Sequence, residues 1–266
     1  METVILIPAR YGSTRFEGKP LAMLEGVSGE RKSLIERSFD AAKAVKGDHA
    51  IYVATDDDRI ADAARAFGAD VVMTSDRCRN GTERCAEAIA NLGVSPEVVV
   101  NLQGDAPLTP PWFIEALIDQ MKTDPNVGMA TPVLRCDVQT VTDFITDRKA
   151  GRVGGTTAVF DHHMNALYFS KEVLPYTDQD FKDGDHIPVF HHVGAYAYRP
   201  AALADYMSWS EGPLEKLEGL EQLRFLENGH KIRCVEVDGR GHVFWELNNP
   251  IDVERIERVL KEKGIG

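Results

Sequence analysis

The segment TVILIP, residues 3–8, is followed directly by ARYGSTRFEGKP, residues 9–20. A short run of β-branched and other apolar residues is typical of a strand that is buried on both faces. Between Ser33 and Val45 the apolar and small residues then recur at helical spacing, and Ser33 is placed to cap the first turn. The order strand, loop, helix predicts the first unit of an α/β fold.

The same alternation continues along the first half of the chain. We expect further strands at 49–54, 70–73, 97–102 and 128–134, and helices at 58–67, 83–92 and 111–121. Strands that alternate with helices of about ten residues indicate a Rossmann-like, doubly wound and mostly parallel sheet with right-handed crossovers. The fold class expected is therefore α/β.

The pattern changes after Gly151. Residues 151–161, 165–170 and 191–198 alternate in the manner of antiparallel strands, and the stretch from Pro250 to Lys261 returns to helical spacing. We expect a single domain over residues 1–266 with a small antiparallel excursion at 151–200. The excursion is expected to complete a pocket and to form a subunit interface.

Charge and composition exclude some classes of partner. The chain has 30 Lys and Arg against 42 Asp and Glu, a formal net charge of -12, which argues against nucleic acid because phosphate backbones are held by an excess of cations. There is no apolar run of about 18 residues, so membrane insertion is not expected. The 4 cysteines show no zinc-like spacing, and free thiols are expected in a reducing cytoplasm.

Three cations stand out against this acidic background. Arg10, Arg15 and Lys19 share the loop at 9–20 with two glycines, at the carboxyl end of the first expected strand. Ligands of open α/β sheets bind at such strand ends, glycines let the backbone approach a phosphate, and the three cations can neutralise a triphosphate. We interpret the loop as a phosphate site, although a solvated surface turn has the same composition. Neither GxGxxG nor GxxxxGK[ST] is present, which disfavours a dinucleotide dehydrogenase.

A carboxylate is expected at the same edge of the sheet. Asp105 lies in NLQGDAP, residues 101–107, just after the expected strand 97–102. Mg²⁺ takes only one or two protein carboxylates and binds substrate phosphates, so an acid facing a cationic loop suits it. An aspartate in an ordinary turn before proline is the alternative interpretation.

The two loops resemble motifs of one known family. IPARYGSTRFEGKPL, residues 7–21, resembles the opening signature of the cytidylyltransferases that activate 3-deoxy-manno-octulosonate (Kdo), and NLQGDAP resembles their NLQGDEP motif. Residues 53–57, 80–84, 192–199 and 214–224 are similar to the family's VATDD, SGTDR, HIGIYAYR and SxLExxExLEQLR segments. The motifs occur in the family's order over nearly the whole chain.

The resemblance implies a fold of the nucleotide-diphospho-sugar transferase type and a reaction. CMP would pass from CTP to the anomeric hydroxyl of Kdo, with release of pyrophosphate, for lipopolysaccharide synthesis, and the enzyme would form a homodimer. It implies nucleotide contacts by Ala9, Arg10, Arg15, Lys19, Asn80, Gly81, Thr82 and Arg84. It implies sugar contacts by Gln103, His192, Tyr196, Glu218, Glu221 and Gln222. Mg²⁺ would be bound by Asp105 and Asn248, and the candidate catalytic residues are Asp105, Arg10 and Lys19.

Alternatives stay open at this stage. His192 alone would pass for a hydrogen-bonded structural histidine, and the acids after residue 214 for an exposed helix face. Asn80, Ala106 and Asn248 depart from the family motifs, which leaves room for another acid sugar, such as amino-Kdo or a nonulosonate. They also leave room for a nucleotide-binding homologue with weak turnover. No neighbour of Asp105 in the sequence is assigned as a general base.

Overall fold

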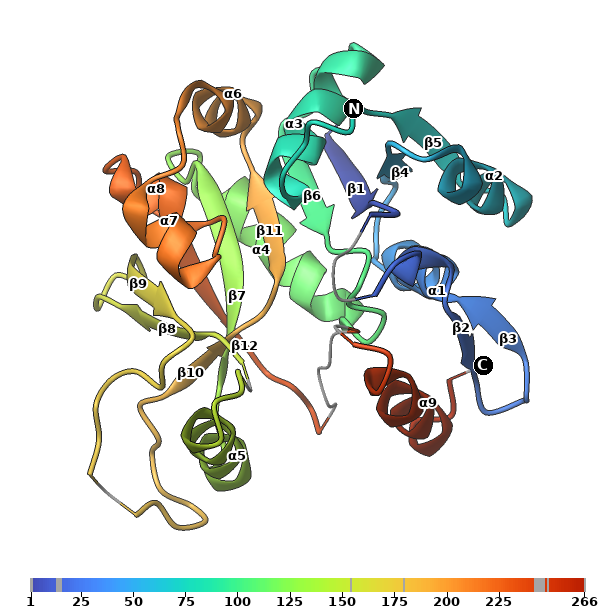
Figure 1. The fold of residues 1–266 in the computed structure, drawn as a ribbon. Coiled ribbons are helices and arrows are strands. Elements are labelled where there is room, and N and C mark those ends of the chain that lie inside the picture. The colour runs from blue at the N-terminus through green and yellow to red at the C-terminus, as the bar shows by residue number, and fades with distance from the viewer. Residues whose placement is uncertain are drawn as a thin grey trace.

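The computed structural model describes residues 2–12, 16–153, 155–178, 180–241, 247 and 249–265. Within these ranges ten strands form one sheet in the order β5-β4-β1-β6-β11-β7-β10-β8-β9, with β12 paired to β7. A separate hairpin consists of β2 (Met23–Glu25) and β3 (Arg31–Ser33). Figure 1 shows the sheet passing through the middle of the molecule, with helices on both sides.

The first half of the chain confirms the predicted parallel strands. β1 (Thr3–Ala9), β4 (Ala50–Thr55), β5 (Asp70–Met73) and β6 (Val98–Leu102) are all parallel neighbours. β11 (Ala195–Tyr198) runs antiparallel to both β6 and β7 (Met129–Arg135), so β7 runs in the same direction as the first four strands. β12 (Arg233–Val237) is parallel to β7. The doubly wound, mostly parallel α/β class is confirmed.

The alternation of side chains along β1 explains the two layers of helices. Ile5 and Ile7 pack with apolar residues of α1 (Leu34–Lys43), α2 (Asp58–Ala66) and α4 (Pro111–Thr123) on one face. Val4 and Leu6 pack with α3 (Gly81–Leu92), α6 (Pro200–Ser208) and α8 (Leu223–Glu227) on the other. Because successive residues of a strand point to opposite faces, one buried run serves two cores.

The predicted antiparallel part is also present. β8 (Thr157–Phe160) and β9 (Ala166–Ser170) form a hairpin, and β8 pairs with β10 (Phe190–His192). β10 and β11 both pair with the same edge of β7, and their registers differ by two residues across Val193 and Gly194. This irregularity lets one stretch of chain pair with β8 in its first part and with β6 in its second.

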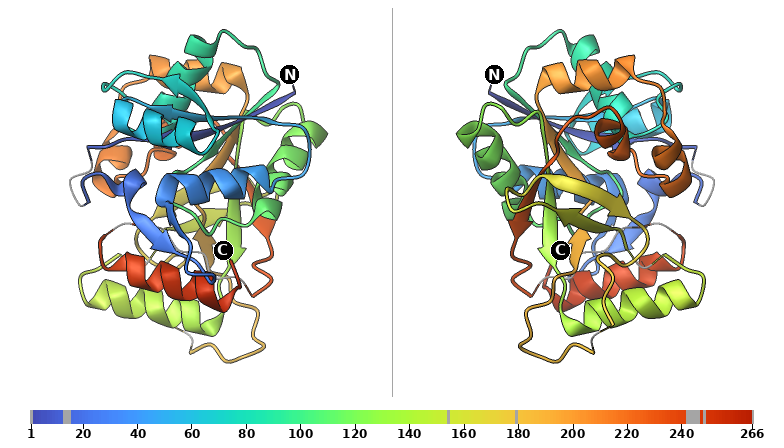
Figure 2. Two further views of the ribbon diagram at one scale, coloured as in Figure 1. Left: turned by 90° about the vertical axis from the view of Figure 1, so that its right-hand side faces the viewer. Right: turned by 90° about the vertical axis from the view of Figure 1, so that its left-hand side faces the viewer.

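Some elements differ from the sequence prediction. The last helix, α9 (Asp252–Glu262), begins two residues after Pro250, with Ile251 as its N-cap. Helices α5 (Val138–Lys149) and α7 (Pro213–Glu218), as well as α6 and β12, were not predicted from periodicity. α9 packs on the hairpin β2–β3, and the chain end returns there, because the Val27 amide donates to the Ile265 carbonyl at 2.9 Å. The two side views in Figure 2 show α9 lying below the sheet.

Two further expectations concern cysteines and membranes. All four cysteines are buried free thiols. Among the helices that the structure describes, none has the length and apolar content needed to cross a bilayer.

Candidate functional site

A large cleft opens at the carboxyl ends of the parallel strands. It has a volume of about 2120 Å³ and is lined by the ends of β1, β6, β7 and β12, together with β10 and the segments after α6. The lining contains ten lysines and arginines and ten acids, whereas the whole chain carries a net charge of -12. The cleft is therefore locally much less acidic than the rest of the surface, as an anionic ligand requires.

Most of the predicted site residues meet in this cleft. The following line it: Ala9, Arg10, Lys19, Asn80, Gly81, Arg84, Gln103, Asp105, His192, Tyr196, Glu221 and Gln222. Thr82 and Glu218 do not line it. Arg15 and Asn248 lie outside the described residues.

The cationic loop and the acidic loop are in direct contact. Lys19 Nζ lies 2.7 Å from Asp105 Oδ2, and the two side chains are 15% and 27% exposed. Lys19 opens a short 3-10 helix, Lys19–Leu21, preceded by Gly18 in the left-handed region with φ 67. The Gly18 amide donates to the Tyr11 carbonyl at 3.0 Å, which folds the loop back toward the sheet. A cation and a carboxylate 86 residues apart thus form one half-buried ion pair.

Two backbone contacts fix Asp105 at this point. A Cβ added to Gly104 would lie 2.7 Å from the Pro8 carbonyl oxygen, so the absence of a side chain lets the two strand ends approach each other. The Leu247 amide donates to the Asp105 carbonyl at 2.9 Å, and Asn249 lines the cleft. Leu247, which precedes Asn248 in the sequence, is therefore held next to Asp105.

The N-terminus of α3 forms a second wall of the cleft. Asn80 is the N-cap, and its side-chain oxygen accepts from the Glu83 amide at 2.9 Å. A Cβ on Gly81 would lie 2.7 Å from Gln103 Nε2, so glycine allows Gln103 to lie against the helix end. The sequence prediction of this helix began at Glu83, two residues late.

A carboxylate from a distant part of the chain lies over the same helix end. Glu221 Oε2 accepts from the Thr82 amide at 3.3 Å, and Gln103 Nε2 donates to Glu221 Oε1 at 3.2 Å. Burial raises the pKa of Glu221 from 4.5 to about 7, and the hydrogen bonds from Thr82 lower it only in part. The positive end of α3 also favours the charged form. Glu221 is thus poised to gain or lose a proton near neutral pH.

His192, on β10, and Gln222, at the start of α8, also line the cleft. Thr131 Oγ1 donates its proton to the Ala195 carbonyl at 2.9 Å. In the bond between Thr131 Oγ1 and His192 Nε2, also 2.9 Å long, we therefore assign Nε2 as the donor. Burial lowers the pKa of His192 to about 3, so the ring is neutral. Tyr196 donates to Gln222 Oε1 at 3.3 Å, while Gln222 Nε2 is buried with no hydrogen-bond partner among the described residues. Gln222 lines the cleft, and its amide nitrogen is not used by the described residues.

The two predicted residues outside the cleft support its walls. Glu218 accepts from the Ser170 hydroxyl at 2.6 Å and from the Lys171 amide at 3.0 Å, which ties α7 to the end of β9. The Thr82 hydroxyl lies 2.8 Å from the Tyr198 hydroxyl. Their side chains contact protein in this structure, and their predicted substrate contacts stay predictions.

A buried network behind α3 was missed by sequence reasoning. Arg224, with a side chain only 1% exposed, binds Glu215 at 2.6 Å and Glu83 at 3.0 Å. Tyr206 lies beside it and also contacts Asn80. The glutamates and Arg224 occur in the motif segments, but no local pattern pairs residues as far apart as 141 positions.

The fold and the cleft together define a class of protein: an α/β enzyme fold with a site for a phosphate-bearing ligand at the carboxyl ends of its parallel strands. A family model described as "Cytidylyltransferase" matches residues 4–232. The chain belongs to the cytidylyltransferase family.

Several proteins of this family are similar over most or all of their length. A 3-deoxy-manno-octulosonate cytidylyltransferase of Maricaulis maris is 43% identical over 264 residues, 99% of each chain. An 8-amino-3,8-dideoxy-manno-octulosonate cytidylyltransferase of Shewanella piezotolerans is 44% identical over 235 residues, which cover 88% of this chain and 89% of that protein. A solved CMP:2-keto-3-deoxy-manno-octonic acid synthetase in complex with CTP superposes with a TM-score of 0.82 at 32% identity, covering 99% of this chain and 100% of the other.

The raised pKa of Glu221 gives a prediction for stability. The pKa is 4.5 in the unfolded chain and about 7 in the folded protein, so only the folded protein holds the proton between these values, and stability falls as pH rises through this window. Glu221→Gln keeps the size and planar end of the side chain but cannot ionise. We expect the unfolding free energy of the variant, relative to wild type, to increase by about 1 to 3 kcal/mol from pH 5 to pH 8.

Chemical denaturation of both proteins at several pH values measures this difference. A constant difference across the window would show that Glu221 ionises at its ordinary pKa and that burial does not perturb it.

Proposed function

We propose that this chain transfers CMP from CTP to the anomeric hydroxyl of Kdo, giving CMP-Kdo and pyrophosphate for lipopolysaccharide synthesis. The observation that carries the proposal is the Lys19–Asp105 pair, which joins the cationic loop to the acidic strand end at the floor of the cleft. The family membership supports the transfer of a cytidylyl group. The Kdo names of relatives that match over the full length support the acceptor.

The reaction requires orientation and charge neutralisation. The sugar hydroxyl attacks the α-phosphorus in line and gives up its proton to solvent, and the bond from that phosphorus to pyrophosphate breaks on the opposite side. The negative charge of the leaving pyrophosphate is stabilised by Arg10, Arg15 and Lys19. Holding two substrates in the reactive orientation can lower the activation barrier by up to about 7 to 11 kcal/mol. Side chains that position the substrates can therefore account for much of the rate enhancement.

Asp105 fits a magnesium ion bound with the nucleotide. Its carboxylate is a hard oxygen ligand, it is partly exposed to the cleft, and it already faces a cation, Lys19 Nζ, at 2.7 Å. We propose Asp105 as a ligand, with Asn248 as the second protein group. When bound, Mg²⁺ would neutralise phosphate oxygens and lower the pKa of the attacking hydroxyl. Lys19 is then free to contact phosphate, since the metal replaces it as the counter-ion of Asp105.

The sugar is proposed to lie between α3 and β10. Gln222 Nε2, buried and unpaired among the described residues, supplies a donor for the carboxylate or a hydroxyl of an acid sugar. The neutral ring of His192, together with Tyr196 and Gln103, adds polar groups at the same end of the cleft. Glu221, in the loop that precedes α8, is the last of the proposed sugar-binding groups in the cleft.

We also propose a homodimer in a reducing cytoplasm. β9 is the end strand of the sheet and carries Leu167, which is 63% exposed, so the excursion 151–200 offers a sheet edge with an exposed apolar side chain to a second copy. Four buried free thiols suit a reducing compartment.

A second acceptor is supported by a specific comparison. The Shewanella protein acting on the 8-amino sugar is as similar in sequence as the Kdo relatives are. Incubating the chain with CTP and Mg²⁺ and offering Kdo, 8-amino-Kdo and a nonulosonate in turn separates the candidates. We expect the highest kcat/KM for pyrophosphate release with Kdo. A preference for the amino sugar would replace Kdo as the acceptor, and no release with any sugar would refute the transferase proposal.

Asp105→Asn tests the role of the acidic strand end. The amide keeps the size of the side chain and the backbone contact with Leu247 but removes the charge that holds a metal. We expect the rate of pyrophosphate release from CTP and Kdo to fall by at least about a hundredfold, with the fold unchanged by circular dichroism.

Asp40→Asn is the matched control. Asp40 also forms an ion pair with a lysine, Lys32, at 2.8 Å, and it does not line the large cleft. Near-normal turnover by Asp105→Asn would contradict the metal role of Asp105.

A further inference from the structure

Tyr206 joins the two sides of the cleft without lining it. It lies on α6 and is 0% exposed. Its hydroxyl accepts from Asn80 Nδ2 at 2.9 Å, and its one proton has two acceptors within reach, the main-chain carbonyl of Glu221 at 3.2 Å and Glu215 Oε1 at 3.4 Å. Asn80 belongs to the segment expected to hold the nucleotide, and Glu221 to the segment expected to hold the sugar.

A second, direct bond closes this connection into a ring. The carboxylate of Glu221 accepts from the Thr82 amide at 3.3 Å, two residues after Asn80. The chain segments 80–82 and 221 are therefore linked twice, once through the Tyr206 hydroxyl and once directly. A shift of either segment strains both links, so the position of one side of the cleft depends on that of the other.

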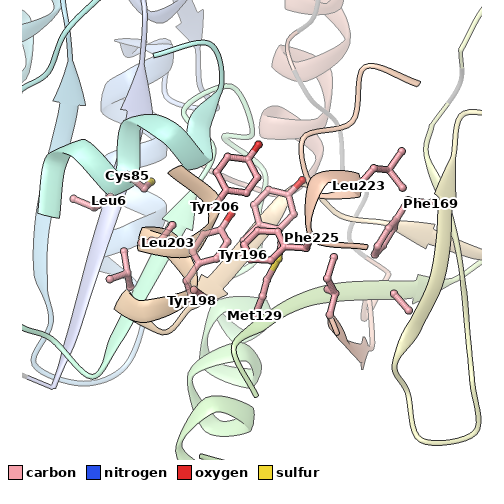
Figure 3. Close-up of a cluster of buried hydrophobic side chains, with 14 of the residues drawn as sticks. Leu6, Cys85, Met129, Phe169, Tyr196, Tyr198, Leu203, Tyr206, Leu223 and Phe225 are labelled. Atoms are coloured by element: carbon pink, nitrogen blue, oxygen red, sulfur yellow. The ribbon is translucent and has the colours of Figure 1, made fainter. Parts of the chain in front are cut away.

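The ring of Tyr206 has little freedom to move. It stacks on Phe225 with centroids 5.2 Å apart, and the Arg224 guanidinium carbon lies 4.1 Å from its centroid. Figure 3 shows Tyr206 beside Phe225 in the buried cluster. Arg224 in turn binds Glu215 and Glu83, and Glu83 is in the first turn of α3. A hydroxyl held this rigidly can impose a geometry on its partners.

Asn80 uses both ends of its amide at this junction. The oxygen caps α3 at the Glu83 amide, and the nitrogen donates to Tyr206. A serine at position 80, as in the SGTDR motif that this segment resembles, could cap the helix but has no amide to donate. The bond to Tyr206 therefore depends on the asparagine of this chain.

We propose that Tyr206 is a positioning residue whose hydroxyl couples nucleotide binding at 80–82 to sugar binding at 221–222. Resting on the proposed function, the inference adds that the two substrates bind cooperatively. A ligand that orders one segment lowers the cost of ordering the other, and the resulting coupling is reciprocal.

Tyr206→Phe removes the hydroxyl and keeps the ring packing. We expect the KM for CTP and the KM for the acid sugar both to rise about 3- to 10-fold, the range that a net hydrogen bond gives. Calorimetry with Kdo and α,β-methylene-CTP, which cannot release pyrophosphate, measures the coupling directly. In wild type, saturating Kdo should tighten binding of the analogue, and in Tyr206→Phe this factor should fall toward one.

Tyr52→Phe is the matched control. It also removes one tyrosine hydroxyl, and Tyr52 lies half-buried on β4 and does not line the cleft. Both KM values and the coupling factor should stay within about twofold of wild type. Thermal unfolding of each variant separates a loss of positioning from a loss of fold.

Asn80→Ser provides a second test that leaves Tyr206 intact. It should keep the cap of α3 and still raise the KM for the sugar, and the double variant with Tyr206→Phe should be no worse than either single variant. Folded variants that bind both substrates as wild type does, or effects that add in the double variant, would overturn the inference. A wild-type chain that turns over no sugar with CTP would instead refute the proposed function.

Discussion

The ion pair between Lys19 and Asp105 is the interaction on which the organisation of the cleft depends. It joins the loops that follow β1 and β6, which are neighbours in the sheet, and its two residues are 86 positions apart in the chain. Gly104 makes the approach possible because the Pro8 carbonyl leaves no space for a Cβ. In a parallel sheet all carboxyl ends meet at one edge, so a cationic loop after one strand and an acid after the next necessarily face each other. The lining of the whole cleft likewise has equal numbers of cations and acids, although the protein as a whole is acidic.

The N-terminus of α3 is the second organising feature. Three groups at this helix start contact residues from the second half of the chain. The Asn80 cap contacts Tyr206, the Thr82 amide contacts Glu221, and the Glu83 carboxylate contacts Arg224. The segment proposed to hold the sugar thus packs directly on the segment proposed to hold the nucleotide. The charge of Glu221 is favoured by the helix end and opposed by burial, which explains a carboxyl that titrates near neutral pH.

The sequence was sufficient for the parallel half of the fold and much less so for the rest. Buried strands such as 3–8, with a capped amphipathic helix after them, carry strong local signals, and Ser33 accepts from Glu36 as an N-cap should. α6 and β12 lack such periodicity, although Pro200 and Pro213 stand at helix starts where proline is favoured. Most predicted site residues, found by resemblance, line one cleft. Tyr206 was not predicted because its hydroxyl meets Asn80 126 residues away, and contacts at that separation follow from packing alone.

The central claim is that Lys19 and Asp105 belong to one triphosphate site. The most direct measurement is the affinity of the chain for CTP, CDP and CMP in the presence of Mg²⁺, compared between wild type and Lys19→Met. In wild type, affinity should rise with each added phosphate, and in the variant the preference for CTP over CMP should fall by about tenfold or more, the loss of one charged hydrogen bond. An unchanged preference in a folded Lys19→Met variant would place the phosphates elsewhere and contradict the claim.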